Sequence, residues 1–330
     1  MYPLADNIFS DDVALEPIRA GFGRGLRQAG EADERVVALC ADLTESTQMH
    51  VFKEAFPERF VEIGIGEQNL VTVASGMARA GKIPFTSSYA AFSPGRNWEQ
   101  IRTTACLNDM PVKVIGSHAG VSVGPDGATH QMLEDIALMR VLPNMVVIAP
   151  GDSVEAEKAT RAIATNGKPS YLRLAREKTP IFSTAESPFE IGAAYVLREG
   201  RDVTLLGTGT MTYQLLKTAE VLATQGVNAE VVHVPTIKPL DEATILASVR
   251  KTGRVVTAEE AQRAGGFGGA VAELLSEKLP TPLLRIGMKD RFGESGAPSE
   301  LLEHFGMTAE TIAPQVAEFV GRVPRYHQGF

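Results

Sequence analysis

The chain has 330 residues, of which 44% are hydrophobic and 22% charged, which excludes a disordered chain, a collagen-like fibre and a disulfide-stabilised miniprotein. Its 32 basic and 40 acidic residues give a formal charge of −8, so broad nucleic-acid binding, which needs a basic face, is not expected. The sequence contains neither a signal peptide nor an apolar run as long as the ~18 residues of a membrane span, so we expect a soluble, cytoplasmic protein.

The two cysteines, Cys40 and Cys106, lie in apolar stretches, and we expect both to be buried free thiols. The sequence shows no Cys or His cluster with the spacing of a zinc site, so we expect no metal bound by this chain alone.

In the first half of the chain, short β-branched segments alternate with segments of helical character. Strands are predicted at 35–40, 60–63, 82–87, 112–117, 145–149 and 170–174. Helices are predicted at 12–29, 67–80, 96–107, 131–140 and 152–165, the last opened by Asp152 after a Pro-Gly turn. Apolar strands separated by helices predict a parallel sheet with helices on both faces.

A proline-containing stretch, 177–190, interrupts this rhythm and is predicted to be an interdomain linker. A second alternating series follows it. Its strands are predicted at 193–197, 202–207, 229–234, 254–259 and 282–287, and its helices at 211–224, 242–250, 267–278 and 308–320. The fold class is therefore α/β, with two doubly wound domains at 1–185 and 186–330 and a loose end at 325–330.

Three glycine-rich spots, at 21–25, 207–210 and 265–269, do not form a complete dinucleotide or P-loop motif. We interpret them as tight turns and close helix packing and expect no nucleotide site there.

Side chains that could take part in binding or catalysis follow several predicted strands. Glu67 opens a helix just after the turn Gly64–Gly66, at the carboxyl end of a strand, where open α/β sheets bind ligands. Taken alone, a glutamate at this position is more often an ordinary first-turn residue, since a helix N-terminus favours negative charge. Tyr89 and Phe92 follow the next strand, and they could form either a stacking platform or part of the core.

The next strand leads into a long glycine-rich loop that carries His118, Asp126 and His130. A loop of this length at a strand end is usually functional or disordered. Arg173 and Arg176 end the sixth strand, and Arg176 could either clamp a phosphate or lie on the surface.

Taken together, these pieces resemble the second half of a transketolase, a pyrimidine-binding domain followed by the family's C-terminal domain. The similar stretches are ADLTEST (41–47), GIGEQN (64–69), YAAF (89–92), HAGVSVGPDGATHQ (118–131), LAREK (174–178) and RFGESG (291–296). The DGATHQ segment is the most specific of them.

The resemblance implies thiamine diphosphate as cofactor. Glu67 matches the glutamate that bonds the aminopyrimidine ring nitrogen and favours the imino tautomer, so that the difficult chemistry is the cofactor's. Tyr89 and Phe92 match aromatic residues around the pyrimidine, and Asp42 and Ile65 match further cofactor contacts.

For the substrate, the resemblance implies that His118 and His130 touch the donor sugar and that both, with Glu67, are catalytic. It places Asp126 on a sugar hydroxyl. The positions implied at the phosphate end are Arg19, Ser46, His118 and Arg176. A two-carbon unit would pass from a ketose phosphate to an aldose phosphate.

The family holds the diphosphate and its Mg²⁺ (or Ca²⁺) with a Gly-Asp-Gly stretch. The nearest stretch here, Pro150–Ser153, lacks the second glycine, and the chain is about half the length of a whole transketolase. The resemblance therefore implies a split transketolase, in which an N-terminal partner subunit supplies the diphosphate and metal site and two copies of each chain assemble.

Other interpretations remain open at the level of sequence. The chain could be half of an enzyme similar to 1-deoxyxylulose-5-phosphate synthase, in which the DGxTHQ-type loop also occurs, or the beta subunit of a 2-oxo acid dehydrogenase. It could also be a non-catalytic scaffold, because fold alone does not give function.

Overall fold

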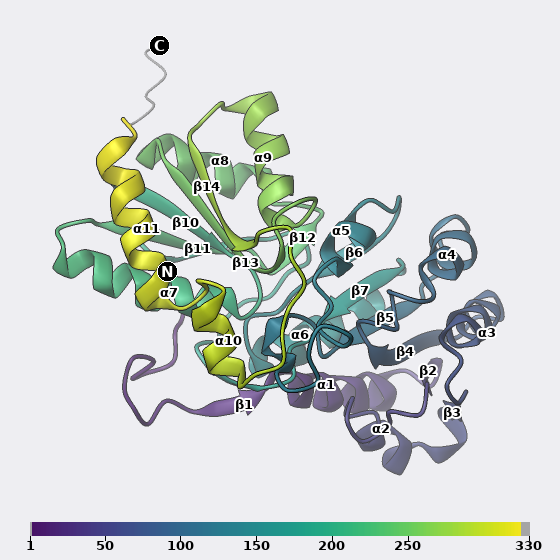
Figure 1. The fold of residues 1–330 in the computed structure, drawn as a ribbon. Helices are drawn as coiled ribbons and strands as arrows, with labels where there is room; N and C mark the ends of the chain where they lie inside the picture. Colours follow the sequence, from purple (N-terminus) through teal and green to yellow (C-terminus); the bar gives the residue numbers. More distant parts are fainter. Residues whose placement is uncertain (1, 325–330) are drawn as a thin grey trace.

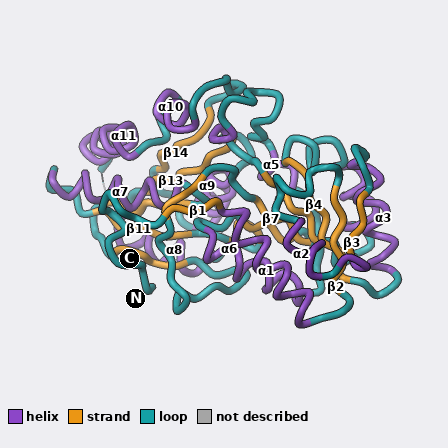
Figure 2. Tube along the Cα trace, turned by 90° about the horizontal axis from the view of Figure 1, so that it is seen from below, coloured by secondary structure: helices purple, strands orange, loops and turns teal. Residues whose placement is uncertain are grey.

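The computed structural model describes residues 2–324 and forms two lobes, each a twisted sheet flanked by helices (Figure 1). The predicted loose end at 325–330 lies outside the described residues. Seen from below, the helices lie on both sides of the strands (Figure 2), so the predicted α/β class is confirmed. Within the described part of the chain, no helix combines the length and apolar character needed to cross a bilayer.

The first lobe contains a seven-stranded sheet in the order β12-β6-β7-β5-β4-β2-β3. All its neighbouring strands run parallel except the edge pair β12 and β6. Its strands are β2 (Val36–Cys40), β3 (Phe60–Glu62), β4 (Ile83–Tyr89), β5 (Lys113–Ser117), β6 (Val146–Ile148), β7 (Ser170–Arg173) and β12 (Thr236–Lys238).

Both faces of this sheet are buried, which explains why β2 and β6 are continuous apolar runs rather than alternating ones. In β2, Val36, Ala38 and Cys40 pack beneath α1 and α6, whereas Val37 and Leu39 face α3 and α5. The helices of this lobe are α1 (Ile18–Ala32), α2 (His50–Ala55), α3 (Glu67–Arg79), α4 (Trp98–Gln100), α5 (Asp135–Arg140) and α6 (Ser153–Thr165). Cys40 and Cys106 are buried free thiols, as predicted.

The second lobe contains a five-stranded sheet in the order β14-β13-β10-β11-β9. Helices α7 and α11 cover one face, and α8 and α9 cover the other. The strands are β9 (Tyr195–Arg198), β10 (Val203–Gly207), β11 (Ala229–His233), β13 (Val255–Gln262) and β14 (Leu283–Met288). The helices are α7 (Met211–Thr224), α8 (Glu242–Thr252), α9 (Phe267–Lys278), α10 (Pro298–His304) and α11 (Ala309–Arg322).

The two lobes are joined more closely than the sequence predicts. Strand β12 comes from the second half of the chain but pairs with β6 at the edge of the first sheet. One continuous hydrophobic cluster also contains α3 and α5 of the first lobe together with α8 and α9 of the second. The predicted boundary between residues 185 and 186 stays a prediction.

Three predicted segments differ from the structure. The helix predicted from residue 12 begins at Ile18, because β1 (Leu15–Pro17) pairs with β8 (Lys178–Pro180) inside the predicted linker. The helix predicted at 96–107 is a short turn, α4, followed by a π-helix at Ile101–Cys106. The helix predicted from residue 131 begins only at Asp135, because residues 131–134 are loop and α5 covers Asp135–Arg140.

The glycines at 21–25 act as packing residues, as predicted. Helices α1 and α6 lie so close that a Cβ added at Gly21 would stand 1.7 Å from the carbonyl oxygen of Ser153. Helix α6 begins as predicted, since the Asp152 carboxylate accepts a hydrogen bond from the Glu155 amide at 2.9 Å.

Candidate functional site

The predicted site residues follow the carboxyl ends of neighbouring parallel strands of the first sheet. In spatial order, Arg176 follows β7, His118 follows β5, Tyr89 ends β4, Asp42 follows β2 and Glu67 follows β3. Because parallel strands end at the same edge, segments that are far apart in sequence meet there.

Glu67 is the first residue of α3 and only 2% of its surface is exposed. Its carboxylate Oε2 accepts a hydrogen bond from Arg96 Nη1 at 2.6 Å, and its backbone oxygen accepts one from Asn97 Nδ2 at 2.8 Å. The Arg96 guanidinium also lies over the Phe92 ring, 4.8 Å from its centroid. Burying an ionised carboxylate is costly unless it is paired. The ion pair with Arg96 therefore stabilises the ionised form of Glu67, and a bound ligand could also donate to this carboxylate.

Four rings form a cluster next to this carboxylate. Tyr89 stacks on His118 with centroids 3.9 Å apart, and Phe92 meets His130 edge to face at 5.4 Å. Tyr89 lies 6.1 Å from Phe92 and 6.2 Å from His130. The sequence left open whether Tyr89 and Phe92 form a stacking platform or part of the core. In the structure both rings are half-buried and contact the predicted site histidines.

His118 is 3% exposed and has a positive φ of 58°, and its Nδ1 lies 2.9 Å from the Ser117 hydroxyl. Burial and the nearby positive charges of Arg19 and Arg176 lower the pKa of His118 to about 3. A neutral imidazole keeps one donor and one acceptor, so His118 can bond a hydroxyl group in either sense. His130 Nδ1 lies 2.9 Å from the Thr129 hydroxyl.

Two arginines converge beside His118. Arg19 Nη1 donates to the backbone oxygen of Arg176, while Arg176 Nη1 donates to the Val123 oxygen at 2.6 Å and lies 3.9 Å from Asp126. Burial and the charge of Arg176 lower the pKa of Arg19, and Arg19 Nε is buried without a hydrogen-bond partner among the described residues. Two close guanidinium groups with an unused donor suit an anionic ligand.

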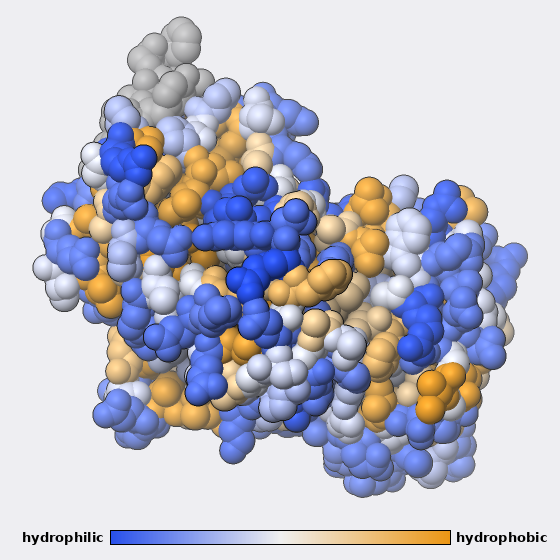
Figure 3. Space-filling model, viewed as in Figure 1, coloured by the Kyte–Doolittle hydropathy of each residue, from blue (hydrophilic) through white to orange (hydrophobic). Residues whose placement is uncertain are grey.

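The remaining predicted residues lie on the rim of the site. Asp42 is exposed, Ser46 is half-buried in the turn after β2, and Ile65 is 78% exposed. Within the described part of the chain no hydrogen bond links them to Glu67 or the ring cluster, although they follow β2 and β3 at the same edge of the sheet. On the face drawn in Figure 3, hydrophobic residues form separate orange patches among hydrophilic ones.

Some site residues were not singled out in the sequence. Arg96 pairs with Glu67 from 29 positions away, which no local pattern reveals. Glu62 connects the turn after β2 to the turn after β3. Its carboxylate accepts hydrogen bonds from the backbone amides of Asp42 at 2.8 Å and Gly64 at 2.9 Å. A carboxylate that ends a strand before a double-glycine turn is the signal that could have indicated Glu62.

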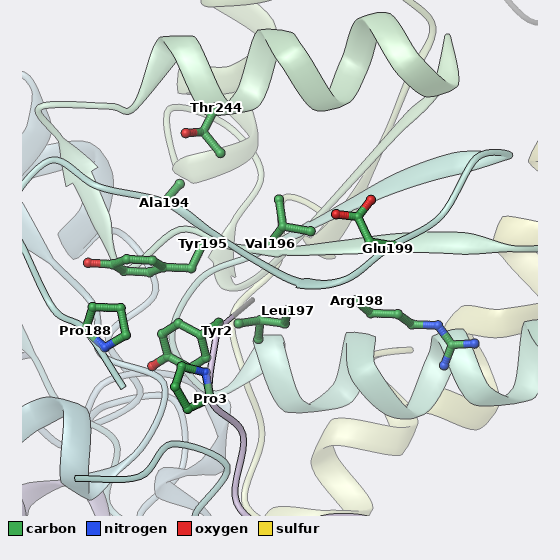
Figure 4. Close-up of a pocket in the computed structure, with 10 residues that line it drawn as sticks. All are labelled: Tyr2, Pro3, Pro188, Ala194, Tyr195, Val196, Leu197, Arg198, Glu199 and Thr244. Carbon is green, nitrogen blue, oxygen red and sulfur yellow. The ribbon is translucent and has the colours of Figure 1, made fainter. Parts of the chain in front are cut away.

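The described residues contain no group of three or more His, Cys, Asp or Glu side chains that could hold a metal ion. A cavity of about 880 Å³ lies elsewhere, between the N-terminal segment and β9. Its walls include Tyr2 and Tyr195, whose ring centroids are 5.2 Å apart, with Thr244 on the α8 side (Figure 4). None of the predicted site residues lines it.

We expect the His118 imidazole to stay neutral from pH 8 down to about pH 5, because its pKa is about 3 whereas an unfolded histidine has a pKa of about 6.5. Between about pH 6.5 and pH 3, His118 is therefore protonated in the unfolded chain but stays neutral in the folded chain. The contribution of His118 to the free energy of unfolding is complete above about pH 6.5 and falls as the pH drops toward 3. An NMR titration, with the resonance assigned from His118→Asn, measures this directly, and a signal that titrates between pH 6 and 7 would contradict it.

Comparisons with known proteins agree with this geometry. Residues 17–181 match the transketolase pyrimidine-binding domain, and residues 192–312 match the transketolase C-terminal domain. A protein of Methanocaldococcus jannaschii, named for a transketolase C-terminal section, is 44% identical over 304 residues, which are 91% of this chain and 95% of that relative. The 6-deoxy-6-sulfo-D-fructose transketolase subunit SqwH of Clostridium sp. is 41% identical, over 90% of this chain and 92% of the relative.

A solved structure described as a split gene transketolase, inactive beta4 tetramer, superposes with a TM-score of 0.87 and 43% identity. The match covers 92% of this chain and 98% of that one. A 1-deoxy-D-xylulose-5-phosphate synthase of Desulforudis audaxviator is 39% identical over 88% of this chain but only 46% of its own length. The chain therefore belongs to the transketolase family, whose members depend on thiamine diphosphate.

Proposed function

We propose that this chain is the C-terminal subunit of a split transketolase that moves a two-carbon ketol unit from a ketose phosphate to an aldose phosphate. The observation that carries the proposal is the meeting of three kinds of group at one sheet edge. These are the buried Glu67 carboxylate, the cluster of aromatic and imidazole rings, and the Arg19 and Arg176 guanidinium groups.

The residues present fit the pyrimidine end of thiamine diphosphate. Glu67 supplies a buried acceptor oxygen, and Tyr89 and Phe92 supply apolar surface next to it. When bound, the cofactor provides the carbanion chemistry of two-carbon transfer. In our proposal the Glu67 carboxylate would stabilise a proton on the pyrimidine ring of the bound cofactor, and its Oε2 would be shared with, or released from, Arg96, which now donates to it.

His118, His130 and Asp126 would orient the hydroxyl groups of the donor sugar, and Arg19 and Arg176 would bind its anionic end. Support comes from Arg19 Nε, which is buried with no hydrogen-bond partner among residues 2–324, and from the charge of Arg176 near it. The Clostridium relative is named for a sulfonated ketose, so a sulfonate is the competing anionic group at this end. Assays with a phosphorylated and a sulfonated ketose as donors distinguish the two.

The diphosphate and its Mg²⁺ (or Ca²⁺) would be bound by an N-terminal partner subunit. Support comes from the solved split gene transketolase, whose chain is matched over 98% of its length. That protein is described as inactive as a beta4 tetramer. Ile65, an exposed apolar residue on the rim of the site, offers surface for such a partner. We propose two copies of each chain in the active enzyme.

Titration calorimetry with thiamine diphosphate and Mg²⁺ tests this division of the site. We expect weak binding to the chain alone, because it offers only the pyrimidine contacts, and tight, Mg²⁺-dependent binding once the partner is added. Tight stoichiometric binding to the chain alone would refute the half-site.

The activity is tested by a tagged pull-down from the native lysate, identification of the co-eluting chain, and assays on the purified complex. We expect ketol transfer between a ketose phosphate and an aldose phosphate. The similarity to 1-deoxy-D-xylulose-5-phosphate synthase makes pyruvate plus an aldose phosphate the second substrate pair to try. Activity with pyruvate in place of the ketose phosphate would identify half of a synthase or a 2-oxo acid dehydrogenase beta subunit, and no activity with either donor would identify a scaffold.

A further inference from the structure

The loop that carries the two site histidines, residues 118–131, is held by side chains from outside it and by its own last residue. Arg176 binds the Val123 oxygen, as described above. Gln131, at the end of the loop, donates from Nε2 to the backbone oxygens of Val121 at 3.0 Å and Glu294 at 2.8 Å. These contacts bind the backbone oxygens at both ends of the first turn, Val121–Val123, and leave its Ser122 amide to another anchor.

That anchor is Glu260, which belongs to β13 of the second lobe and is 2% exposed. Its Oε1 accepts a hydrogen bond from the backbone amide of Ser122 at 2.7 Å. Its Oε2 accepts one from the Thr210 hydroxyl at 2.9 Å. Both carboxylate oxygens are therefore satisfied, and the buried Ser122 amide depends on a residue 138 positions later in the chain.

The loop is shaped to admit this carboxylate. Gly120 has a φ of 93°, and a Cβ there would lie 2.3 Å from Glu260 Oε1, so any larger residue would push the carboxylate away from Ser122. The other end of Glu260 is also fixed, because its backbone oxygen accepts from Arg173 Nη2 at 2.8 Å. The Arg173 Nε in turn binds Asp135 at 2.7 Å.

We propose that Glu260 is a positioning residue through which the second lobe fixes the histidine loop for donor binding. The part of this inference that concerns the donor rests on the proposed function. The second lobe otherwise contributes no predicted site residue, and Glu260 gives it a direct connection to the segment between His118 and His130. Its effect reaches the substrate only through the loop.

Hydrogen exchange of the purified chain, followed by mass spectrometry, tests the anchor without any substrate. Glu260→Ala leaves the Ser122 amide unpaired, and we expect exchange of a peptide covering 118–131 to become about tenfold faster. Glu260→Gln keeps an acceptor for Ser122 and can donate to Thr210, so its exchange should stay within about twofold of the original.

The neighbouring Glu259 provides a matched control. It is equally buried, but its oxygens accept from the amides of Phe267 at 2.6 Å and Gly268 at 2.8 Å, at the start of α9. Glu259→Gln should change exchange at 266–270 and leave the loop as it was. Should Glu260→Ala fail to fold, Thr210→Val removes one partner of the carboxylate without removing Glu260, and faster loop exchange is again expected.

In the assembled enzyme, we expect Glu260→Ala to raise the donor KM about tenfold, with a smaller change in kcat and unchanged cofactor affinity, and Glu260→Gln to restore the KM. Loop exchange that is unchanged in both folded variants, Glu260→Ala and Thr210→Val, would overturn the anchor. Faster loop exchange with an unaltered KM would overturn its role in donor binding. A wild-type complex that transfers no ketol unit, while the exchange results hold, would count against the proposed function and not against the anchor.

Discussion

Glu67→Gln should lower ketol transfer by the assembled enzyme by about 10²–10⁴-fold, the range typical of losing a proton-transfer or proton-holding group. The amide can still accept a hydrogen bond from Arg96, so the fold and the assembly should persist. What it loses is the negative charge that stabilises a proton on the cofactor's ring nitrogen. Steady-state kcat for the complex, measured at saturating cofactor, gives the size of the effect.

The control for this experiment is Glu58→Gln, which removes an exposed carboxylate from the same lobe. It should leave kcat unchanged. A Glu67→Gln complex that assembles normally and turns over at close to the original rate would remove Glu67 from the mechanism.

Asp135→Ala should lower the free energy of unfolding by about 3–5 kcal/mol, because it leaves the buried Arg173 charge without its partner. Asp135 Oδ2 accepts from Arg173 Nε and from the Tyr171 hydroxyl, both at 2.7 Å, and Asp135 is completely buried. Urea unfolding monitored by circular dichroism measures the change.

For comparison, Glu31→Ala breaks an exposed pair with Arg27 and should cost less than about 0.5 kcal/mol. If the Asp135 variant were no less stable than the Glu31 variant, the buried pair would not stabilise this sheet. The two substitutions together separate the effect of burial from that of charge pairing alone.

Much of the first sheet was predictable because it contains short apolar segments buried on both faces, as in β2 and β6. The segments that were missed have little local signal. Strand β12 has three residues, and β1 and β8 form only by pairing with each other across more than 160 positions. The segment 96–107 has a helical composition, but its hydrogen bonds widen into a π-helix that periodicity cannot distinguish from an α-helix.

For the candidate site, the sequence predicted several of the residues that meet but not how they are held. Glu67 and the histidine loop follow strand ends that the order of parallel strands brings together. Arg96 and Glu260 reach the site from elements whose position depends on tertiary packing, and their side chains carry no motif of their own. The assigned roles of the site residues stay predictions until the variants are measured.

The pairing of β12 with β6 has a consequence for anyone who would produce the first lobe alone. A fragment that ends near residue 185 would lose β12 and expose the backbone donors and acceptors of β6, a strand of three fully buried apolar residues. Such an unprotected edge is a template for pairing with other copies, so the isolated fragment should aggregate. By covering this edge, β12 from the later half of the chain protects the earlier half from aggregation.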